Sequence, residues 1–196
     1  MIHKSKKLLS FFKTLLKEPH LVNLILTNNE VQKEKFLQKY QNLTALPQIE
    51  IKDLGQEVEE KISTFILDGG SLITDLQLLM SLASRNEVKS YFEIGTWRGE
   101  SVFNVAKILE DCTTLNLSEK EMKDFGWNPK YAEQHAILTK KNPKILHLQG
   151  NTVNFDFEAL NKKYDLIFID GDHTYEMVKS DTEKVFQHLV HENSIV

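Results

Sequence analysis

The residues best suited to chemistry in this sequence follow an apolar stretch at residues 90–95. Glu93 and Gly95 come at its end, Gly99 follows, and a helical pattern opens at Ser101. Glycine lets a backbone approach a ligand closely or adopt a positive φ, and the first turn of a helix offers unpaired N–H groups. A carboxylate at Glu93 would repel a pyrophosphate and would favour a cationic or hydroxyl-bearing ligand. The pattern predicts a nucleotide-sized ligand site at this strand-to-helix turn.

A second group of reactive side chains follows the apolar run at residues 164–169. It comprises Asp170, Asp172 and His173, with Glu176 close behind. Because an imidazole titrates at about 6.5 when unperturbed, His173 is a candidate general base for a substrate hydroxyl. The alternative is structural, since Asp172, His173 or a neighbouring threonine could simply cap the helix that follows. The residues alone leave both interpretations open.

These side chains need a scaffold, and the apolar pattern predicts one. Strands are expected at 90–95, 113–117, 144–148, 164–169 and 194–196, with helical segments between them, the last at about 174–190. Strands that alternate with helices indicate a parallel sheet covered on both faces. Ligands of such sheets bind beyond the carboxyl ends of the strands. Asn116 and Asn151 stand at two of these ends, so we expect them near the first two groups.

The sequence before residue 90 predicts mainly helices. Residues 1–46 carry helical patterns, including 30–40 with Asn28 or Asn29 as its cap, and a linker follows at 44–51. Further helices are predicted at 56–67 and 72–84, with Ser71 capping the second. We therefore divide the chain into an N-terminal helical appendage, 1–55, and an α/β domain, 56–196.

The glycine turn, Glu93-x-Gly95-x-x-x-Gly99-x-Ser101, resembles motif I of the class I S-adenosylmethionine-dependent methyltransferases. The run from Leu166 through Asp170, Asp172 and His173 to Asp181 resembles methyltransferase family 24. The resemblance covers about residues 56–196. It implies a Rossmann-like three-layer sandwich with a mostly parallel sheet, preceded by N-terminal helices.

The resemblance also implies roles for individual residues. Asn116 would accept a hydrogen bond from the ribose, and Asn151 would contact the adenine. Asp170 would lie where the methyl group is transferred and, as in the catechol O-methyltransferase-like relatives, could bind Mg²⁺. Asp170 and His173 would act on the acceptor. The amino-acid portion of S-adenosylmethionine would be framed by Glu93, Gly95, Thr96, Gly99 and Ser101.

The implied activity is S-adenosylmethionine-dependent methyl transfer, with oxygen of a small molecule or glycan as the expected acceptor. A non-catalytic binding protein or partner subunit with the same fold is the alternative. Two further hypotheses are an NAD-dependent enzyme and a metal-dependent hydrolase. The family fold has seven strands, whereas five are expected here and the fifth is cut at Val196. We therefore expect either a fragment of a longer enzyme or a sheet that a partner completes. A second copy of the chain, in a homo-oligomer, is one candidate for that partner.

The composition and charge of the chain limit the classes of protein to which it can belong. The 196 residues carry a formal charge of −4, which gives no global basic field for nucleic acid. The single cysteine, Cys112, suits a reducing compartment, and we expect a cytoplasmic protein. No apolar run reaches the ~20 residues that span a bilayer. The lysines and apolar residues of 1–17 predict a basic amphipathic helix that contacts a membrane surface, the chain's own core or a second subunit.

Overall fold

The computed structural model describes residues 2–19, 29–39, 49–55, 57–66, 69–127 and 129–196. The chain divides into two compact units, Met1–Gln48 and Ile49–Val196. The first contains helices α1 (Ile2–Lys17) and α3 (Asn29–Lys39), which confirms the predicted helices over these residues. Asn28 and most of the predicted linker at 44–51 lie outside the described residues.

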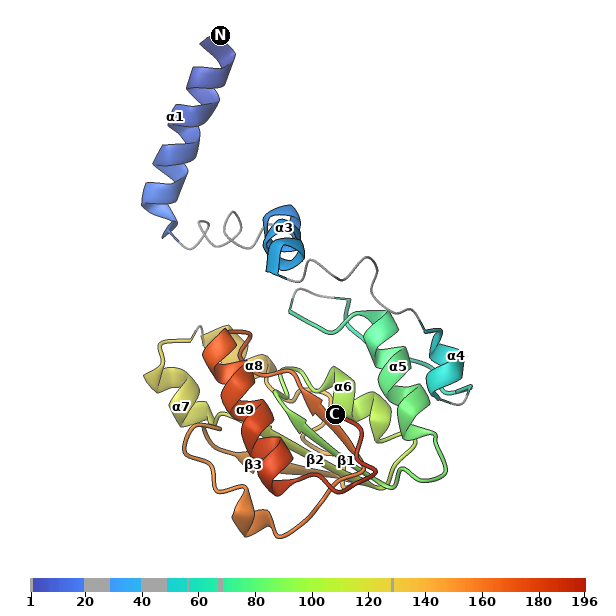
Figure 1. Cartoon of the computed structure of the whole chain (residues 1–196). Helices are drawn as coiled ribbons and strands as arrows, with labels where there is room; N and C mark the ends of the chain where they lie inside the picture. Colours follow the sequence, from blue (N-terminus) through green and yellow to red (C-terminus); the bar gives the residue numbers. More distant parts are fainter. Residues whose placement is uncertain (1, 20–28, 40–48, 56, 67–68, 128) are drawn as a thin grey trace. The chain divides into compact units, whose positions relative to one another are not determined.

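A sheet of four parallel strands forms the centre of the second unit (Figure 1). Its order is β3-β2-β1-β4, so β1 is flanked on one side by β2 and on the other by β4. In the register, Phe92 pairs with Thr113 of β2 and with Ile167 of β4. The predicted parallel sheet is therefore confirmed. Its strands are β1 (Ser90–Ile94), β2 (Asp111–Asn116), β3 (Ile145–Gln149) and β4 (Leu166–Ile169).

The strand predicted at 194–196 is reduced to a single bridge. Ile195 pairs in parallel with Leu166, and its carbonyl accepts a hydrogen bond of 2.8 Å from the amide of Ile167. The amide of Ile195 donates to the carbonyl of Asp165, also at 2.8 Å. These bonds place Ile195 beside β4, on the side away from β1.

Both faces of the sheet are covered, because successive residues of a strand point to opposite faces. Tyr91 packs on one side with side chains of α5 (Ile73–Ala83) and α6 (Glu100–Val105). Phe92 packs on the other with Val185 and Leu189, at the end of α9 (Tyr175–His188). All five residues of β1 are buried, as expected for a central strand. Burying each of the large apolar side chains contributes about 1.5–3 kcal/mol.

The remaining elements are short and connect the strands. They are α4 (Ile51–Leu54), α7 (Glu119–Asp124), α8 (Pro129–Gln134) and the 3-10 helix η2 (Glu158–Leu160). α4 belongs to the second compact unit, whereas the sequence places it in the N-terminal appendage. No helix in the described ranges is both long and apolar enough to cross a membrane.

The helix predicted at 56–67 is wrong, because residues 57–66 contain no helical residue. Side chains of α6 supply this segment with hydrogen bonds instead. Asn104 accepts from the amide of Ser63 at 2.8 Å and donates to its carbonyl at 2.7 Å. Glu100 accepts from the amide of Phe65 at 2.7 Å. A backbone satisfied by a neighbouring element does not need the internal bonds of a helix.

The predicted cap at Ser71 is also wrong, by one residue. Leu72 is the N-cap of α5, and its amide donates to the Asp75 carboxylate at 3.3 Å. The acid in the first turn therefore accepts from the N-cap amide, whereas a capping serine would have accepted from an amide within the first turn.

Candidate functional site

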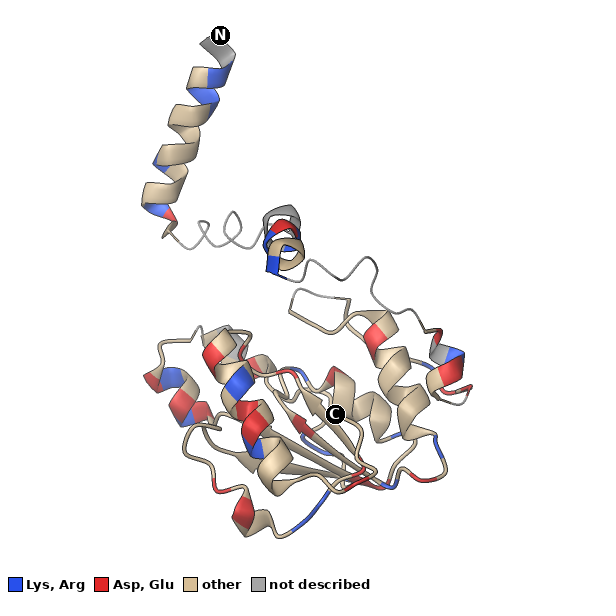
Figure 2. Cartoon of the chain, viewed as in Figure 1, with Lys and Arg blue, Asp and Glu red and all other residues tan. Residues whose placement is uncertain are grey.

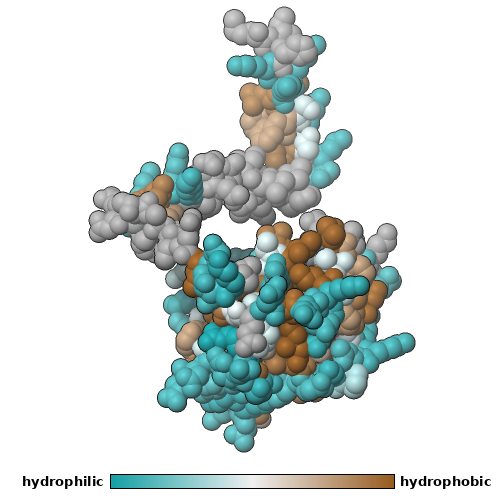
Figure 3. Space-filling model, turned by 90° about the vertical axis from the view of Figure 1, so that its right-hand side faces the viewer, coloured by the Kyte–Doolittle hydropathy of each residue, from teal (hydrophilic) through white to brown (hydrophobic). Residues whose placement is uncertain are grey.

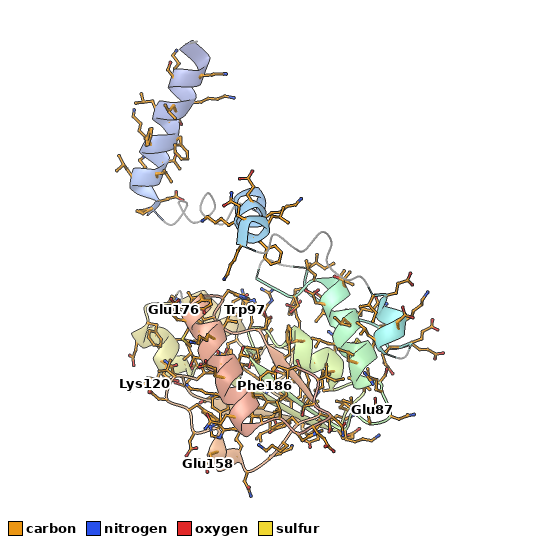
Figure 4. The ribbon with its side chains drawn as sticks, viewed as in Figure 1. Glu87, Trp97, Lys120, Glu158, Glu176 and Phe186 are labelled. Atoms are coloured by element: carbon orange, nitrogen blue, oxygen red, sulfur yellow. The ribbon has the colours of Figure 1, made fainter. Side chains whose placement is uncertain are left out.

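The loops that follow the four strands enclose a cavity of about 820 Å³. In Figure 4, Trp97 and Glu176 mark the end of the domain where the strands finish, and Glu87 and Glu158 mark the opposite end. The cavity is large enough for a nucleotide-sized ligand. Its lining includes the predicted site residues Gly95, Thr96, Ser101, Asn116, Asn151, Asp170 and His173.

The floor of the cavity lies where β1 and β4 end side by side. Gly95 adopts a φ of +100°, and a Cβ added to it would come within 2.1 Å of the carbonyl oxygen of Asp170. The amide of Asp170 donates to the carbonyl of Ile94 at 2.9 Å. This junction is also the point where the strand order reverses, which is the usual ligand position in such sheets. Only glycine allows the two backbones to approach this closely.

The second glycine of the turn, Gly99, faces away from the cavity. It is the N-cap of α6, with a φ of +85°, and an added Cβ would lie 2.6 Å from the side chain of Thr139. The segment that contains Thr139 is hydrogen-bonded to the turn, since Ala136 donates to the carbonyl of Trp97 at 2.6 Å. Gly99 therefore packs the turn against its neighbour, and it is not part of the cavity lining.

Glu93, the acid of the turn, is fully buried below the cavity and does not line it. Its carboxylate accepts hydrogen bonds from Tyr91 at 2.8 Å, from Ser101 at 2.6 Å and from Thr114 at 2.8 Å. Burial raises the pKa of Glu93 to about 7, although these hydroxyl donors lower it in part. Because Ser101 does line the cavity, Glu93 can influence a ligand through that hydroxyl.

Asn116, at the end of β2, holds the glycine turn in place. Its Oδ1 accepts a hydrogen bond of 3.3 Å from the amide of Thr96, and its Nδ2 donates to the carbonyl of Leu117 at 3.3 Å. The hydroxyl of Thr96 is hydrogen-bonded to that of Thr114, which links it to the Glu93 carboxylate. The ends of β1 and β2 thus form one polar network on the cavity wall.

The loop after β3 is fixed by the start of α7. Ser118 and Glu121 form a capping box, in which the carboxylate of Glu121 accepts from the amide of Ser118 at 2.8 Å. The same carboxylate accepts from the amide of Asn151 at 3.2 Å. Hydrogen bonds from Ser118 lower the pKa of Glu121. The Oδ1 of Asn151 accepts from the amide of Val153 at 2.9 Å, so the side chain is oriented by its own loop.

Asp170 and His173 lie at the end of β4, with 3.8 Å between the carboxylate Oδ1 and the imidazole Nε2. Burial raises the pKa of Asp170, while His173 is largely exposed. Thr174 is the N-cap of α9, and its amide donates to the Oδ1 of Asp172 at 2.8 Å. His173 is therefore not required as a cap. Asp170 and His173 together provide two proton acceptors at the strand junction.

Several cavity residues were not among the predicted site residues. Asp181 of α9 is 1% exposed, and burial raises its pKa. His135 is also buried, and burial lowers its pKa to about 4, so the ring is neutral at physiological pH. The buried ion pair of Arg98 with Glu100, at 3.2 Å, forms another part of the lining. Asp181 stands in the sequence run after β4 that resembles methyltransferase family 24, so the sequence pointed to its region. No sequence pattern indicated that His135 would line the cavity.

The described side chains do not support a metal centre. No group of three or more His, Cys, Asp or Glu residues in the described ranges is placed to hold a metal ion. A divalent ion such as Mg²⁺ needs several oxygen ligands, and Asp170 alone does not provide them. The expectation of Mg²⁺ at Asp170 therefore gains no support from the described side chains.

Comparisons with known proteins identify domains that are similar to this one. A family model described as a methyltransferase domain, that of methyltransferase family 24, matches residues 92–196. The match begins within β1 and continues past α9, so it includes most of β1 and all of the other three strands.

Several solved structures with similar folds are also methyltransferases by name. The methyltransferase PaMTH1 from Podospora anserina, solved with bound SAH, is 18% identical over 85% of this chain and 68% of its own, with a TM-score of 0.51. A candidate caffeoyl-CoA O-methyltransferase from Staphylococcus aureus is 24% identical over 90% of this chain and 70% of its own, with a TM-score of 0.46. No curated protein matched the chain. At this identity, the PaMTH1 likeness establishes the fold.

Proposed function

The chain belongs to methyltransferase family 24, and we propose that it transfers the methyl group of S-adenosylmethionine to an oxygen of a small molecule or glycan. The observation that carries the proposal is the placement of Asp170 and His173 at the β1–β4 junction, inside a cavity of about 820 Å³. A site for this reaction must hold the donor, align the acceptor and remove its proton. The residues around the junction can meet each requirement.

The donor half of the cavity suits an adenosyl group with an amino-acid tail. The PaMTH1 structure with the same fold contains the demethylated product, SAH. In the present chain, the amide groups of Asn116 and Asn151 would face the ribose and the adenine. Ser101, backed by Glu93, and the backbone at Gly95 would face the amino-acid tail. Amide groups accept hydrogen bonds without the added strength of a full charge, so we expect moderate affinity.

Asp170 and His173 would act at the acceptor end. When an acceptor oxygen attacks the donor methyl group, the sulfur–carbon bond breaks and its electron pair stays on sulfur. The hydroxyl proton must then pass to a base. Because burial raises the pKa of Asp170, its carboxylate takes up a proton more readily than an exposed one. His173, 3.8 Å away, could carry that proton to solvent.

A second candidate function is cofactor binding without catalysis, as a partner subunit. The observation in its favour is that the Oδ1 atoms of both Asn116 and Asn151 already accept backbone hydrogen bonds, from Thr96 and Val153. Groups engaged in this way hold loops in position and have fewer hydrogen bonds left for a ligand.

Titration calorimetry with S-adenosylhomocysteine and with NAD, followed by methyl transfer from labelled S-adenosylmethionine to a panel of hydroxyl acceptors, tests the proposal. We expect binding of S-adenosylhomocysteine but not NAD. We also expect Asp170→Asn to lower turnover by about 10²-fold or more with little change in affinity. Glu183→Gln, an exposed change on α9, is the matched control and should change neither.

Three results would redirect the assignment. A preference for NAD would exclude the methyltransferase proposal for this cavity. Binding of S-adenosylhomocysteine without turnover on any acceptor would favour the partner-subunit function. Full activity in Asp170→Asn would remove Asp170 from the catalytic step.

A further inference from the structure

Helix α1 (Ile2–Lys17) carries a surface that the proposed reaction does not use. Its sequence contains five lysines and no acidic residue. The large apolar side chains Leu8, Leu9, Phe12 and Leu16 are all exposed. Figure 3 shows apolar side chains gathered along this helix with hydrophilic side chains beside them. The helix is therefore both strongly amphipathic and uniformly basic.

The arrangement of the two kinds of side chain is specific. Projected at about 100° per residue, the apolar side chains fill roughly half of the helix circumference. That half comprises Leu8, Leu9, Phe11, Phe12, Leu15 and Leu16. Lys7 falls just beyond one edge of this arc, and Lys6 and Lys13 fall just beyond the other. Lys4 lies within the arc, close to the first edge. When the arc is buried in a flat surface, both edges bring ammonium groups to the same depth.

We propose that α1 lies on an anionic lipid surface, with its apolar half between the acyl chains and its lysines among the headgroups. A helix of this type sinks about 5–10 Å into the boundary between headgroups and acyl chains. The long methylene chains of lysine at the edges can extend outward, so the ammonium groups reach the phosphates. Cations on both sides of the arc complement a plane of negative charge.

A protein surface would complement this helix less well. Its groove would need acidic side chains along both rims, free to pair with the lysines. In residues 49–196, acidic and basic side chains are interspersed, as Figure 2 shows. Several acids already form ion pairs there, including Asp111 with Lys162 at 2.6 Å and Glu110 with Lys144 at 2.6 Å. Charge complementarity thus favours the lipid over the chain's own domain or a second copy.

Sedimentation of the full chain with vesicles tests the proposal. We expect the protein to bind vesicles that contain phosphatidylserine and to bind pure phosphatidylcholine at least tenfold more weakly. High salt should weaken the binding, because it screens the lysines. Lys6→Glu with Lys13→Glu should reduce the partition coefficient at least tenfold. Leu8→Ser with Phe12→Ser should do the same by removing apolar area.

Helix α3 (Asn29–Lys39) offers the matched control. It also has exposed lysines, but acidic residues alternate with them along the helix. Lys33→Glu with Lys35→Glu should leave vesicle binding unchanged. Equal binding to both lipids, or binding that survives the α1 substitutions, would overturn the proposal. Association of the protein with itself that the α1 substitutions abolish, without any vesicle binding, would overturn it in favour of a second copy. Affinity for S-adenosylhomocysteine is measured separately, so this test is independent of the catalytic assignment.

Discussion

At the scale of single residues, the carboxylate of the glycine turn lies below the cavity, where a ligand cannot touch it directly. Glu93 collects hydrogen bonds from Tyr91, Ser101 and Thr114, and it is completely buried. A charge in such a place is costly unless hydrogen bonds compensate for lost water. Glu93 is therefore balanced between its two protonation states near neutral pH.

Stability should consequently depend on pH through Glu93. Burial raises its pKa from 4.5 to about 7, so the folded state holds this proton more tightly than the unfolded state. The resulting stability is fully present below about pH 4.5 and is lost as the pH rises through 7. Relative to Glu93→Gln, the free energy of unfolding of the wild type should fall by about 3 kcal/mol over that interval. Urea unfolding at a series of pH values measures the difference, and parallel pH profiles for the two proteins would contradict it.

The burial of Glu93 shows where inference from the sequence stops at this scale. Spacing correctly placed Glu93, Gly95 and Ser101 at one strand-to-helix turn. It could not show which side chains point into the cavity, because that depends on the face of the sheet from which each one projects. His135 was missed for a related reason, since only the folded chain brings the end of α8 to the cavity.

At the scale of elements, the contact between β1 and β4 is tightly constrained. Gly95→Ala should cost at least about 3 kcal/mol, because the new Cβ would meet the Asp170 carbonyl at 2.1 Å while φ stays at +100°. Gly126→Ala is the control, since Gly126 has a φ of +73° with nothing within 4 Å. It should cost only about 1 kcal/mol. Urea midpoints compare the two, and equal losses would argue against the close approach at Gly95.

The elements were predicted with mixed success, for identifiable reasons. The strands and α9 have apolar patterns that only a covered parallel sheet satisfies, and they were predicted within a few residues. The segment 57–66 has apolar residues at helical spacing, yet Glu100 and Asn104 of α6 bind its backbone in a non-helical conformation. Tertiary hydrogen bonds outweighed the local apolar pattern, and the spacing of residues in the sequence does not predict such bonds.

At the scale of the whole molecule, the single cysteine reports on the integrity of the fold. Cys112 is buried in the core beside β1, and burial raises its pKa to about 12. The native thiol should therefore resist a disulfide reagent, and full unfolding in urea should raise the labelling rate by about 10³-fold or more. Absorbance of the released thiolate measures the rate, with Cys112→Ser as the unreactive control. Rapid labelling of the native protein would show that the core opens easily.

The separation between the cavity and the core has a consequence for how such a protein can diversify. Of the described residues that line the cavity, only Ile94 and Leu115 belong to the two apolar clusters that hold the sheet. Most of the remaining lining comes from loops whose replacement leaves those clusters intact. Descendants of this chain could thus exchange one acceptor for another through many small changes at the rim, with little loss of foldability along the way.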